Sequence, residues 1–345
     1  MPTKIAVLAA VPPSGEQGGA ERFSEGLQNA LRDEGAEADI LSVVSDERDY
    51  YQIQESYLRF YDLDLSAYDG VISTKAPAYL VRHPNHVCYL QHTMRAFYDL
   101  FERQFPKPSK ALLSQRRFIR QLDTAALRPP RTRRRFTISH EVTQRLEKYN
   151  GLDSDVLYQA STLCGFRRGA YQYVFLPGRL HRWKRVDLVI KAMRYVRAKV
   201  KLIIVGTGED ELALRSLAVK DPRISFLGRI SDEELLDLYA NALVVPFVPL
   251  QEDFGLVTLE AFHSEKPVLT CVDSGEPARI VEHGHTGFVC APAPKSIAKR
   301  IDQLAADPDA AARMGRAGAK SIQHINWKKV AVTLLEALNT DAPAG

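Results

Sequence analysis

The sequence predicts an α/β protein made of two Rossmann-like domains, each built on a doubly wound parallel sheet. The first observation is the length of 345 residues, which allows two domains with a core each. The second is that short apolar runs alternate with helical patterns along the chain, and the third is that glycine-containing turns separate them. We expect one domain over residues 1–165, a second over 166–322, and a C-terminal helical segment over 323–345.

Composition and charge narrow the class of protein. Hydrophobic residues make up 45% and charged residues 26%, which is typical of a globular protein. Four widely spaced cysteines favour free thiols in a reducing compartment over disulfides or a metal site. No run reaches the roughly 18 apolar residues of a membrane span, and Pro12 and Pro13 end the first apolar run without a signal-peptide cleavage site. We therefore expect a cytoplasmic protein.

The first half of the chain opens as a β-loop-α-β unit. Residues 4–10 predict a buried strand, 20–32 a helix and 38–44 a second strand. The loop between the first strand and the helix carries Gly15, Gly18 and Gly19, but these do not form the dinucleotide motif GxGxxG. Further strands are expected at 69–74, 86–90, 136–139 and 155–158, and Ser139 is expected to cap a helix that stops at Gly151.

The second half continues the alternation of strands and helices. Strands are predicted at 173–176, 202–205, 224–228, 242–246 and from 268. Ser231 and Glu234 have the spacing of a capping box at the start of a helix. Residues 164–170 are the predicted linker between the domains.

The joint between the predicted strand at 242–246 and the following helix has the features of an anion site. We expect a loop carrying Glu252 and a helix that starts near Gly255, with Glu260 in its early turns. The first turn of a helix presents unpaired N–H groups and the positive end of the dipole, and glycine allows close backbone approach. Two carboxylates beside a bound phosphate suit sugar hydroxyls. The alternative is that Glu252 is a solvated loop residue and Glu260 part of an ordinary helix face.

The wider sequence resembles the retaining glycosyltransferases of GT-B fold that share two glutamates eight positions apart. The motifs are the segment Glu252 to Glu260, FLPGRLHRWKRVDLVIKAM at 175–193, VGTGED at 205–210, and the strand-turn-helix pattern at 267–289. This resemblance implies two Rossmann-like domains that face a cleft. It also implies that the helix in 323–345 returns to the N-terminal domain, which would be the acceptor side.

The resemblance implies a role for each matching residue. Arg179 and Lys184 would hold the donor diphosphate and stabilise the charge that develops on the leaving group. Glu252 and His92 would position the transferred sugar, and Glu260 would accept hydrogen bonds from the ribose. The whole implied donor set is Gly18, Gly19, Arg179, Lys184, Gly206, Asp253, Phe254, Gly255, Leu256, Val257 and Glu260. No cofactor and no metal are expected, because a nucleotide diphosphate sugar is the donor substrate.

His92 follows the predicted strand at 86–90, in a segment similar to one found in mannosyl-transferring members. The segment reads Gln91-His92-Thr93-Met94-Arg95, and it lacks the proline usual there. The similarity implies that His92 faces the transferred sugar and that Arg95 contacts the acceptor. A hydrogen-bonded structural histidine is the other interpretation.

A basic stretch from Arg103 to Arg135 holds eleven basic residues and one acid, Asp123. Apolar residues interleave with the charges, which is consistent with an amphipathic helix on an anionic membrane surface. A solvated helix face that contacts acceptor phosphates is the alternative. We expect no nucleic acid partner, because no reading motif accompanies the stretch.

One departure from the family pattern concerns the turn at Gly275. Glu276 stands where the family often has a second glycine, and Arg279 stands where it often has a glutamate. Glu276 would place a side chain near the sugar, so the pattern leaves the donor sugar open.

The resemblance predicts a hexosyltransferase acting in cell-surface polysaccharide, lipopolysaccharide or glycolipid synthesis. The donor would be GDP- or UDP-linked, mannose being one possibility, and the acceptor a saccharide or a lipid-linked saccharide. Two alternatives remain at this level, a non-catalytic nucleotide-sugar-binding subunit and a GT-B sugar-nucleotide epimerase.

Overall fold

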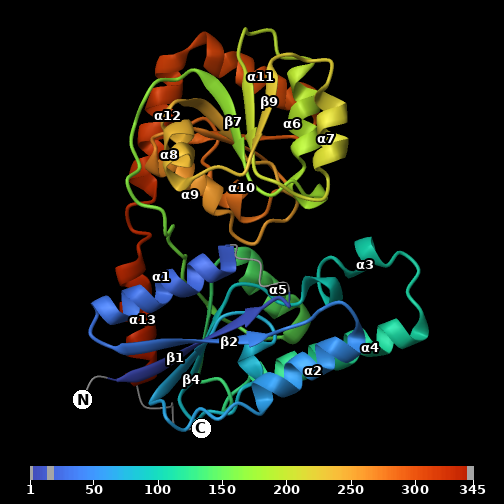
Figure 1. Cartoon of the computed structure of the whole chain (residues 1–345), viewed down its shortest axis with the longest axis vertical. Coiled ribbons are helices and arrows are strands. Elements are labelled where there is room, and N and C mark those ends of the chain that lie inside the picture. Colours follow the sequence, from blue (N-terminus) through green and yellow to red (C-terminus); the bar gives the residue numbers. More distant parts are fainter. Residues whose placement is uncertain (1–2, 14–18, 340–345) are drawn as a thin grey trace. The chain divides into compact units, whose positions relative to one another are not determined.

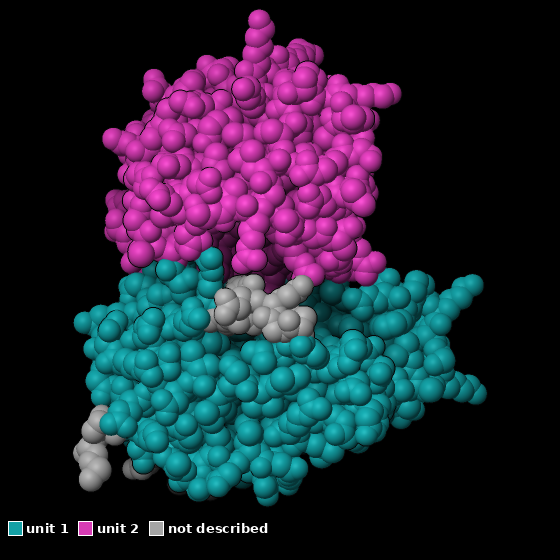
Figure 2. Space-filling model, viewed as in Figure 1, with its two compact units in different colours: residues 1–162, 325–345 teal, residues 163–324 magenta. Residues whose placement is uncertain are grey.

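The computed structural model describes residues 3–13 and 19–339, and the chain divides into two compact units. Unit 1 consists of Met1–Thr162 together with Ile325–Gly345, and unit 2 is Leu163–His324 (Figures 1 and 2). Each unit contains one sheet of six strands in its described residues, and every pairing in both sheets is parallel. The predicted α/β class with two parallel sheets is confirmed.

Unit 1 has the strand order β2-β1-β3-β4-β5-β6. Its core strands are almost completely buried, because helices cover both faces of a parallel sheet. Its elements are β1 (Lys4–Val11), α1 (Gly19–Asp33), β2 (Glu37–Val44), α2 (Tyr50–Tyr61), β3 (Gly70–Ser73), η1 (Ala78–Leu80), β4 (His86–Leu90), η2 (Arg95–Phe97), α3 (Phe101–Gln104), α4 (Lys110–Leu127), β5 (Arg134–Thr137), α5 (His140–Asn150), β6 (Asp155–Val156) and α13 (Trp327–Asn339).

The last helix, α13, packs within unit 1 although it follows all of unit 2 in the sequence (Figure 1). The Trp327 ring meets Phe23 of α1 at 5.6 Å, and its indole N–H donates to the carbonyl of Ser161 at 3.0 Å. A Cβ on Gly26 would come within 2.7 Å of the same ring, so glycine there permits the close approach of α1 and α13. Leu334, on the buried face of α13, is fully enclosed.

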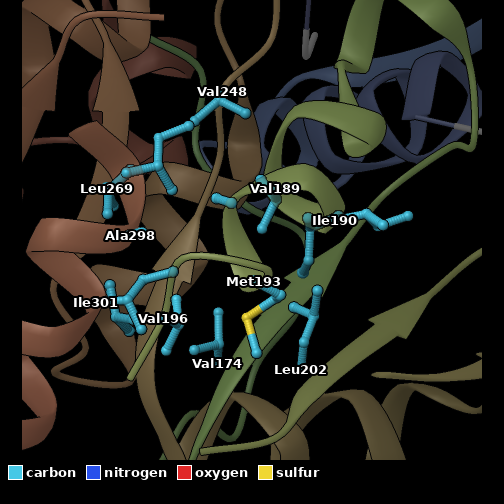
Figure 3. Close-up of a cluster of buried hydrophobic side chains, with 14 of the residues drawn as sticks. Val174, Val189, Ile190, Met193, Val196, Leu202, Val248, Leu269, Ala298 and Ile301 are labelled. Atoms are coloured by element: carbon cyan, nitrogen blue, oxygen red, sulfur yellow. The ribbon is translucent and has the colours of Figure 1, made fainter. Parts of the chain in front are cut away.

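Unit 2 has the strand order β12-β11-β10-β7-β8-β9. Buried side chains of β7, β8, α6 and α11 form its main apolar cluster, part of which Figure 3 shows. Its elements are β7 (Tyr173–Pro177), η3 (Arg182–Lys184), α6 (Val186–Met193), β8 (Leu202–Val205), α7 (Glu211–Ala218), β9 (Ile224–Gly228), α8 (Asp232–Ala240), β10 (Ala242–Pro246), α9 (Leu256–His263), β11 (Val268–Cys271), α10 (Glu276–Ile280), β12 (Gly287–Cys290), α11 (Pro294–Ala306) and α12 (Pro308–Ser321).

Most of the elements expected from the sequence are present, and one strand is displaced. The strand predicted at 136–139 lies at Arg134–Thr137, because these four residues pair with Val87–Leu90 of β4. The cysteines are free thiols as expected, and Cys164 is the exposed one.

Candidate donor site

The sheet of unit 2 brings the motif residues to one edge. The chain runs from β7 to β9 on one side and then crosses to β10 on the other, so β7 and β10 are neighbours at the point where the strand order reverses. The carboxyl ends of parallel strands meet at one edge, and ligands of open α/β sheets bind at such a switch point. Arg179 follows β7, Gly206 follows β8, and the loop carrying Glu252 follows β10.

Two glycines bring the loops after β7 and β8 together backbone to backbone. A Cβ on Gly206 would lie 2.0 Å from the carbonyl oxygen of Gly178, and one on Gly208 would lie 2.2 Å from that of Leu180. No side chain fits at either position. The close approach places Arg179 beside Glu209, with 3.4 Å between Nη2 and Oε2.

His181 completes a small polar cluster with Arg179 and Glu209. Its Nδ1 accepts the N–H of Trp183 at 3.2 Å at the start of η3, and its Nε2 lies 3.0 Å from the Glu209 carboxylate. Burial lowers the pKa of His181 below its ordinary value of 6.5, which favours the neutral ring at pH 7. The neutral ring therefore carries its proton on Nε2 and donates it to Glu209.

Lys184 and Glu252 form the central ion pair of the site. The ammonium Nζ and the carboxylate Oε2 are 2.7 Å apart, and both side chains are largely buried, with 29% and 21% of their surface exposed. The Lys184 ammonium also lies 5.6 Å from the centre of the Phe247 ring. Two residues that the sequence singled out 68 positions apart are thus in direct contact.

Gly255 provides the start of α9. Its φ of +82° is in the left-handed region, and a Cβ would come within 2.5 Å of the Phe247 ring. As the N-cap residue, Gly255 has no side chain with which to cap α9, whose first residues are Leu256 and Val257. The N–H groups of this first turn therefore carry the positive end of the helix dipole beside Lys184 and Glu252.

The remaining residues of the motif fall into buried and half-buried positions. Phe254 is buried and Asp253 is half-buried in the loop before α9. Glu260 is half-buried on α9 and accepts a hydrogen bond from the hydroxyl of Tyr239 at 2.7 Å.

The turn that departs from the family pattern lies directly against Glu252. The Glu276 N–H donates to the Glu252 carbonyl at 3.1 Å, and Gly275 forms an isolated parallel bridge with Glu252. A Cβ on Gly275 would lie 2.4 Å from the Glu252 oxygen, which requires glycine there. Glu276 itself is completely buried, whereas Arg279 is exposed.

Unit 1 contains the candidate residues His92, Arg95 and Gly19. His92 follows β4, is half-buried, and its Nδ1 lies 3.0 Å from the Thr93 carbonyl oxygen. Arg95 pairs with Asp99, which also binds Arg145, so these three residues form a partly buried ionic cluster. Gly19 begins α1, and Gly18 lies outside the described residues.

The basic stretch divides into paired and unpaired arginines. Arg116 donates to Glu102 and to backbone carbonyls, and Arg135 donates to Asp153.

A groove of about 610 Å³ along α4 is lined by the exposed Arg117 and Arg128 and by Arg120. The Nε of Arg120 is buried with no hydrogen-bond partner in the described part of the chain. Leu113 and Phe118 of the same helix are also exposed.

Several residues that shape the site were not predicted as site residues from the sequence. Glu209 lies in the turn VGTGED, so its place after two glycines was a usable signal. Tyr239 and Phe247 reach Glu260 and Lys184 only through tertiary packing, and no local pattern marks them.

Within the described ranges, no group of three or more His, Cys, Asp or Glu side chains could hold a metal ion. In the same ranges, every helix is too short or too polar to span a bilayer.

The two parallel sheets and the switch point of the second one define a two-domain, Rossmann-like GT-B fold. Residues 167–321 match the family described as Glycosyl transferases group 1. The predicted resemblance to GT-B glycosyltransferases of group 1 is therefore confirmed.

Curated relatives and solved structures agree with this assignment. The chain is 27% identical to human alpha-1,3/1,6-mannosyltransferase ALG2, in a match that covers 50% of this chain and 49% of that protein. It is 30% identical to D-inositol 3-phosphate glycosyltransferase of Streptomyces coelicolor, in a match that covers 48% of this chain and 40% of that protein. The chain thus spans half or less of the length of these relatives.

The fold matches at 18% identity that of sucrose-phosphate synthase from Thermosynechococcus elongatus, with a TM-score of 0.75 over 97% of this chain and 98% of that one. It also matches Anabaena HepE in complex with UDP and glucose at 18% identity. The TM-score is 0.72, and the match covers 97% of this chain and 99% of that one.

Proposed function

We propose that this protein is a retaining glycosyltransferase that moves a hexose from a nucleotide diphosphate sugar to a saccharide or lipid-linked saccharide. The observation that carries the proposal is the contact of Lys184 with Glu252 in the loop that leads to α9, whose N-cap residue is Gly255. A cation, a carboxylate and the positive end of a helix dipole within one site suit a sugar diphosphate better than any simpler anion.

The donor diphosphate would lie on the first N–H groups of α9, with Arg179 and Lys184 as its fixed cations. In the structure each of these cations holds a carboxylate, Glu209 for Arg179 and Glu252 for Lys184. The carboxylates occupy positions that an anion can take, so donor phosphates would replace part of these pairings. Glu252 would then be released towards the sugar hydroxyls.

The chemical step requires that negative charge develop on the leaving diphosphate. Fixed cations aimed at that charge stabilise the transition state, and this proposal needs neither a cofactor nor a metal ion for that task. The anomeric configuration of the sugar would be retained if the acceptor attacks from the side of the leaving group. The phosphate oxygen of the leaving group would then take the acceptor proton. His92 would help to position the transferred sugar.

The proposed substrate classes are taken from a relative that matches half of the chain and from a structural neighbour that matches most of it. One relative is named as a mannosyltransferase, and one structural neighbour binds UDP and glucose. The proposed donors are therefore GDP- and UDP-linked hexoses. A role in cell-surface polysaccharide, lipopolysaccharide or glycolipid synthesis would provide saccharide acceptors of this kind.

Transfer from GDP-mannose and UDP-glucose to mono- and disaccharide acceptors, with NMR analysis of the anomeric product, tests the proposal. Glu252→Gln should reduce the transfer rate by about 100-fold or more, because the sugar loses a fixed charged acceptor. Glu282→Gln, an exposed glutamate of the same unit, is the control and should leave the rate unchanged. Full activity of Glu252→Gln would contradict the assignment, and product without any acceptor would indicate an epimerase.

The proposal also includes a cytoplasmic location with peripheral contact to an anionic membrane through the stretch Arg103–Arg135. The support is the pair of exposed arginines, Arg117 and Arg128, beside the exposed Leu113 and Phe118 on α4. Arginine near an anionic surface contributes about 1 kcal/mol per residue to binding.

Co-sedimentation with vesicles tests this contact. The double variant Arg117→Glu/Arg128→Glu should bind phosphatidylglycerol vesicles at least ten times more weakly than the natural protein. Arg313→Glu/Arg316→Glu, two exposed arginines on α12 of unit 2, should bind as the natural protein does. Equal loss in both double variants would show only a general charge effect.

A further inference from the structure

Tyr239 is fixed at one end of the candidate donor site by contacts on both its ring and its hydroxyl. It lies on α8 with no exposed surface, and its ring packs edge to face against Phe175 of β7, with ring centres 5.0 Å apart. Its hydroxyl donates to Glu260 Oε2 at 2.7 Å. A ring held by packing carries its hydroxyl at a defined position, so the hydrogen bond fixes one oxygen of Glu260.

The protonation states make Tyr239 the donor and Glu260 the acceptor. Burial, and then the charge of Glu260, raise the pKa of Tyr239 well above its ordinary value of 10. The phenol therefore keeps its proton, and a carboxylate that accepts it retains further lone pairs. Glu260 itself is half-buried, so this residue is less enclosed than the tyrosine that holds it.

We infer that Tyr239 is a positioning residue that orients Glu260 for the ribose hydroxyls of the nucleotide donor. The inference rests on the proposed function, in which Glu260 binds the ribose. A glutamate on a helix surface samples several rotamers, and each must be given up when the ligand binds. A hydrogen bond that already holds one oxygen removes that cost and fixes the direction in which the carboxylate accepts.

The consequence is a specific selectivity for ribose over deoxyribose. A site built to hydrogen-bond a hydroxyl discriminates strongly against the analogue without it, because the polar group of the site is then left unpaired. This discrimination depends on how well Glu260 is aimed. Loss of the Tyr239 hydroxyl should therefore weaken the binding of a ribonucleotide more than that of its 2′-deoxy counterpart.

Calorimetry on the full chain with UDP, GDP and their 2′-deoxy analogues tests the inference. Tyr239→Phe should bind the ribonucleotide roughly tenfold more weakly and the deoxynucleotide almost unchanged. Tyr173→Phe is the matched control, because its hydroxyl donates to the Leu238 carbonyl at 3.1 Å, one residue before Tyr239. This control should retain the natural ratio of the two affinities.

A double-mutant cycle with Glu260→Gln separates positioning from a structural effect. In the Glu260→Gln background, Tyr239→Phe should no longer change the ratio of ribonucleotide to deoxynucleotide affinity. If Tyr239→Phe leaves the ratio of ribonucleotide to deoxynucleotide affinity unchanged, whether or not both affinities fall, the inference is overturned while the donor site stays in place. Absence of nucleotide binding by the natural protein would overturn the proposed function and this inference together.

Discussion

The Asp123 side chain is completely buried in unit 1, where it contacts two tyrosine hydroxyls. It lies on α4, and the hydroxyls of Tyr57 and Tyr98 donate to its two oxygens at 2.6 Å each. Burial raises its pKa to about 6, although these hydrogen bonds work in the opposite direction. The single acid of the basic stretch is thus part of the core and does not offset the surface charge.

The stability of the protein should therefore depend on pH through Asp123. Between its ordinary pKa of 3.8 and about 6, the folded state binds more protons at this group than the unfolded state does. The free energy of unfolding should fall as the pH rises through this range, by about 3 kcal/mol from this group alone. Urea unfolding of the natural protein and Asp123→Asn from pH 4 to 7 measures the difference.

The stability advantage of the natural protein over Asp123→Asn should be greatest near pH 4 and smallest above pH 6. Asp155→Asn, which removes an exposed carboxylate that pairs with Arg134, serves as the control. Parallel pH profiles for the natural protein and Asp123→Asn would contradict the expectation.

At the scale of elements, α9 depends on the glycine that precedes it. Gly255→Ala should destabilise unit 2 in two ways, because a left-handed residue costs about 1–2 kcal/mol and the new Cβ meets the Phe247 ring. It should also abolish nucleotide binding, since the first turn of α9 must move. Chemical unfolding and calorimetry with UDP and GDP measure the two effects.

Gly284→Ala separates these causes. Gly284 has a φ of +79°, but no described atom lies within 4 Å of a Cβ there. It should show the conformational cost alone and keep nucleotide affinity. If Gly255→Ala behaves in the same way, the contact with Phe247 is not important for the site.

Elements with local signals were predictable from the sequence. Ser231 and Glu234 form the expected capping box, and Gly151 ends α5 in the left-handed conformation. Contacts between distant residues were not predictable, because they depend on packing. Arg135 belongs to a strand and binds Asp153, and the hydrogen bond of Tyr239 to Glu260 joins two different helices.

At the scale of the whole molecule, a substitution near the C-terminus should weaken the N-terminal unit. Leu334 of α13 is fully buried, and Leu334→Ala should cost about 2–5 kcal/mol of stability in unit 1. Hydrogen exchange should accelerate in β1 and β4 and remain unchanged in β7 and β8. The exposed Lys329→Ala on the same helix should alter neither set.

Faster exchange in both sheets of Leu334→Ala would show instead that the two units unfold as one. Unchanged exchange in β1 and β4 would show that α13 contributes little to the core of unit 1.

The position of α13 also sets the order in which the chain can complete its units on the ribosome. Unit 2 is continuous in sequence, whereas unit 1 needs residues made after all of unit 2. At about 5–20 residues per second, the first 162 residues wait roughly 10 to 35 s for α13. During that time the surface of α1 that α13 covers remains open to other nascent chains. The N-terminal unit begins first and is completed last, so chaperone dependence should be concentrated there.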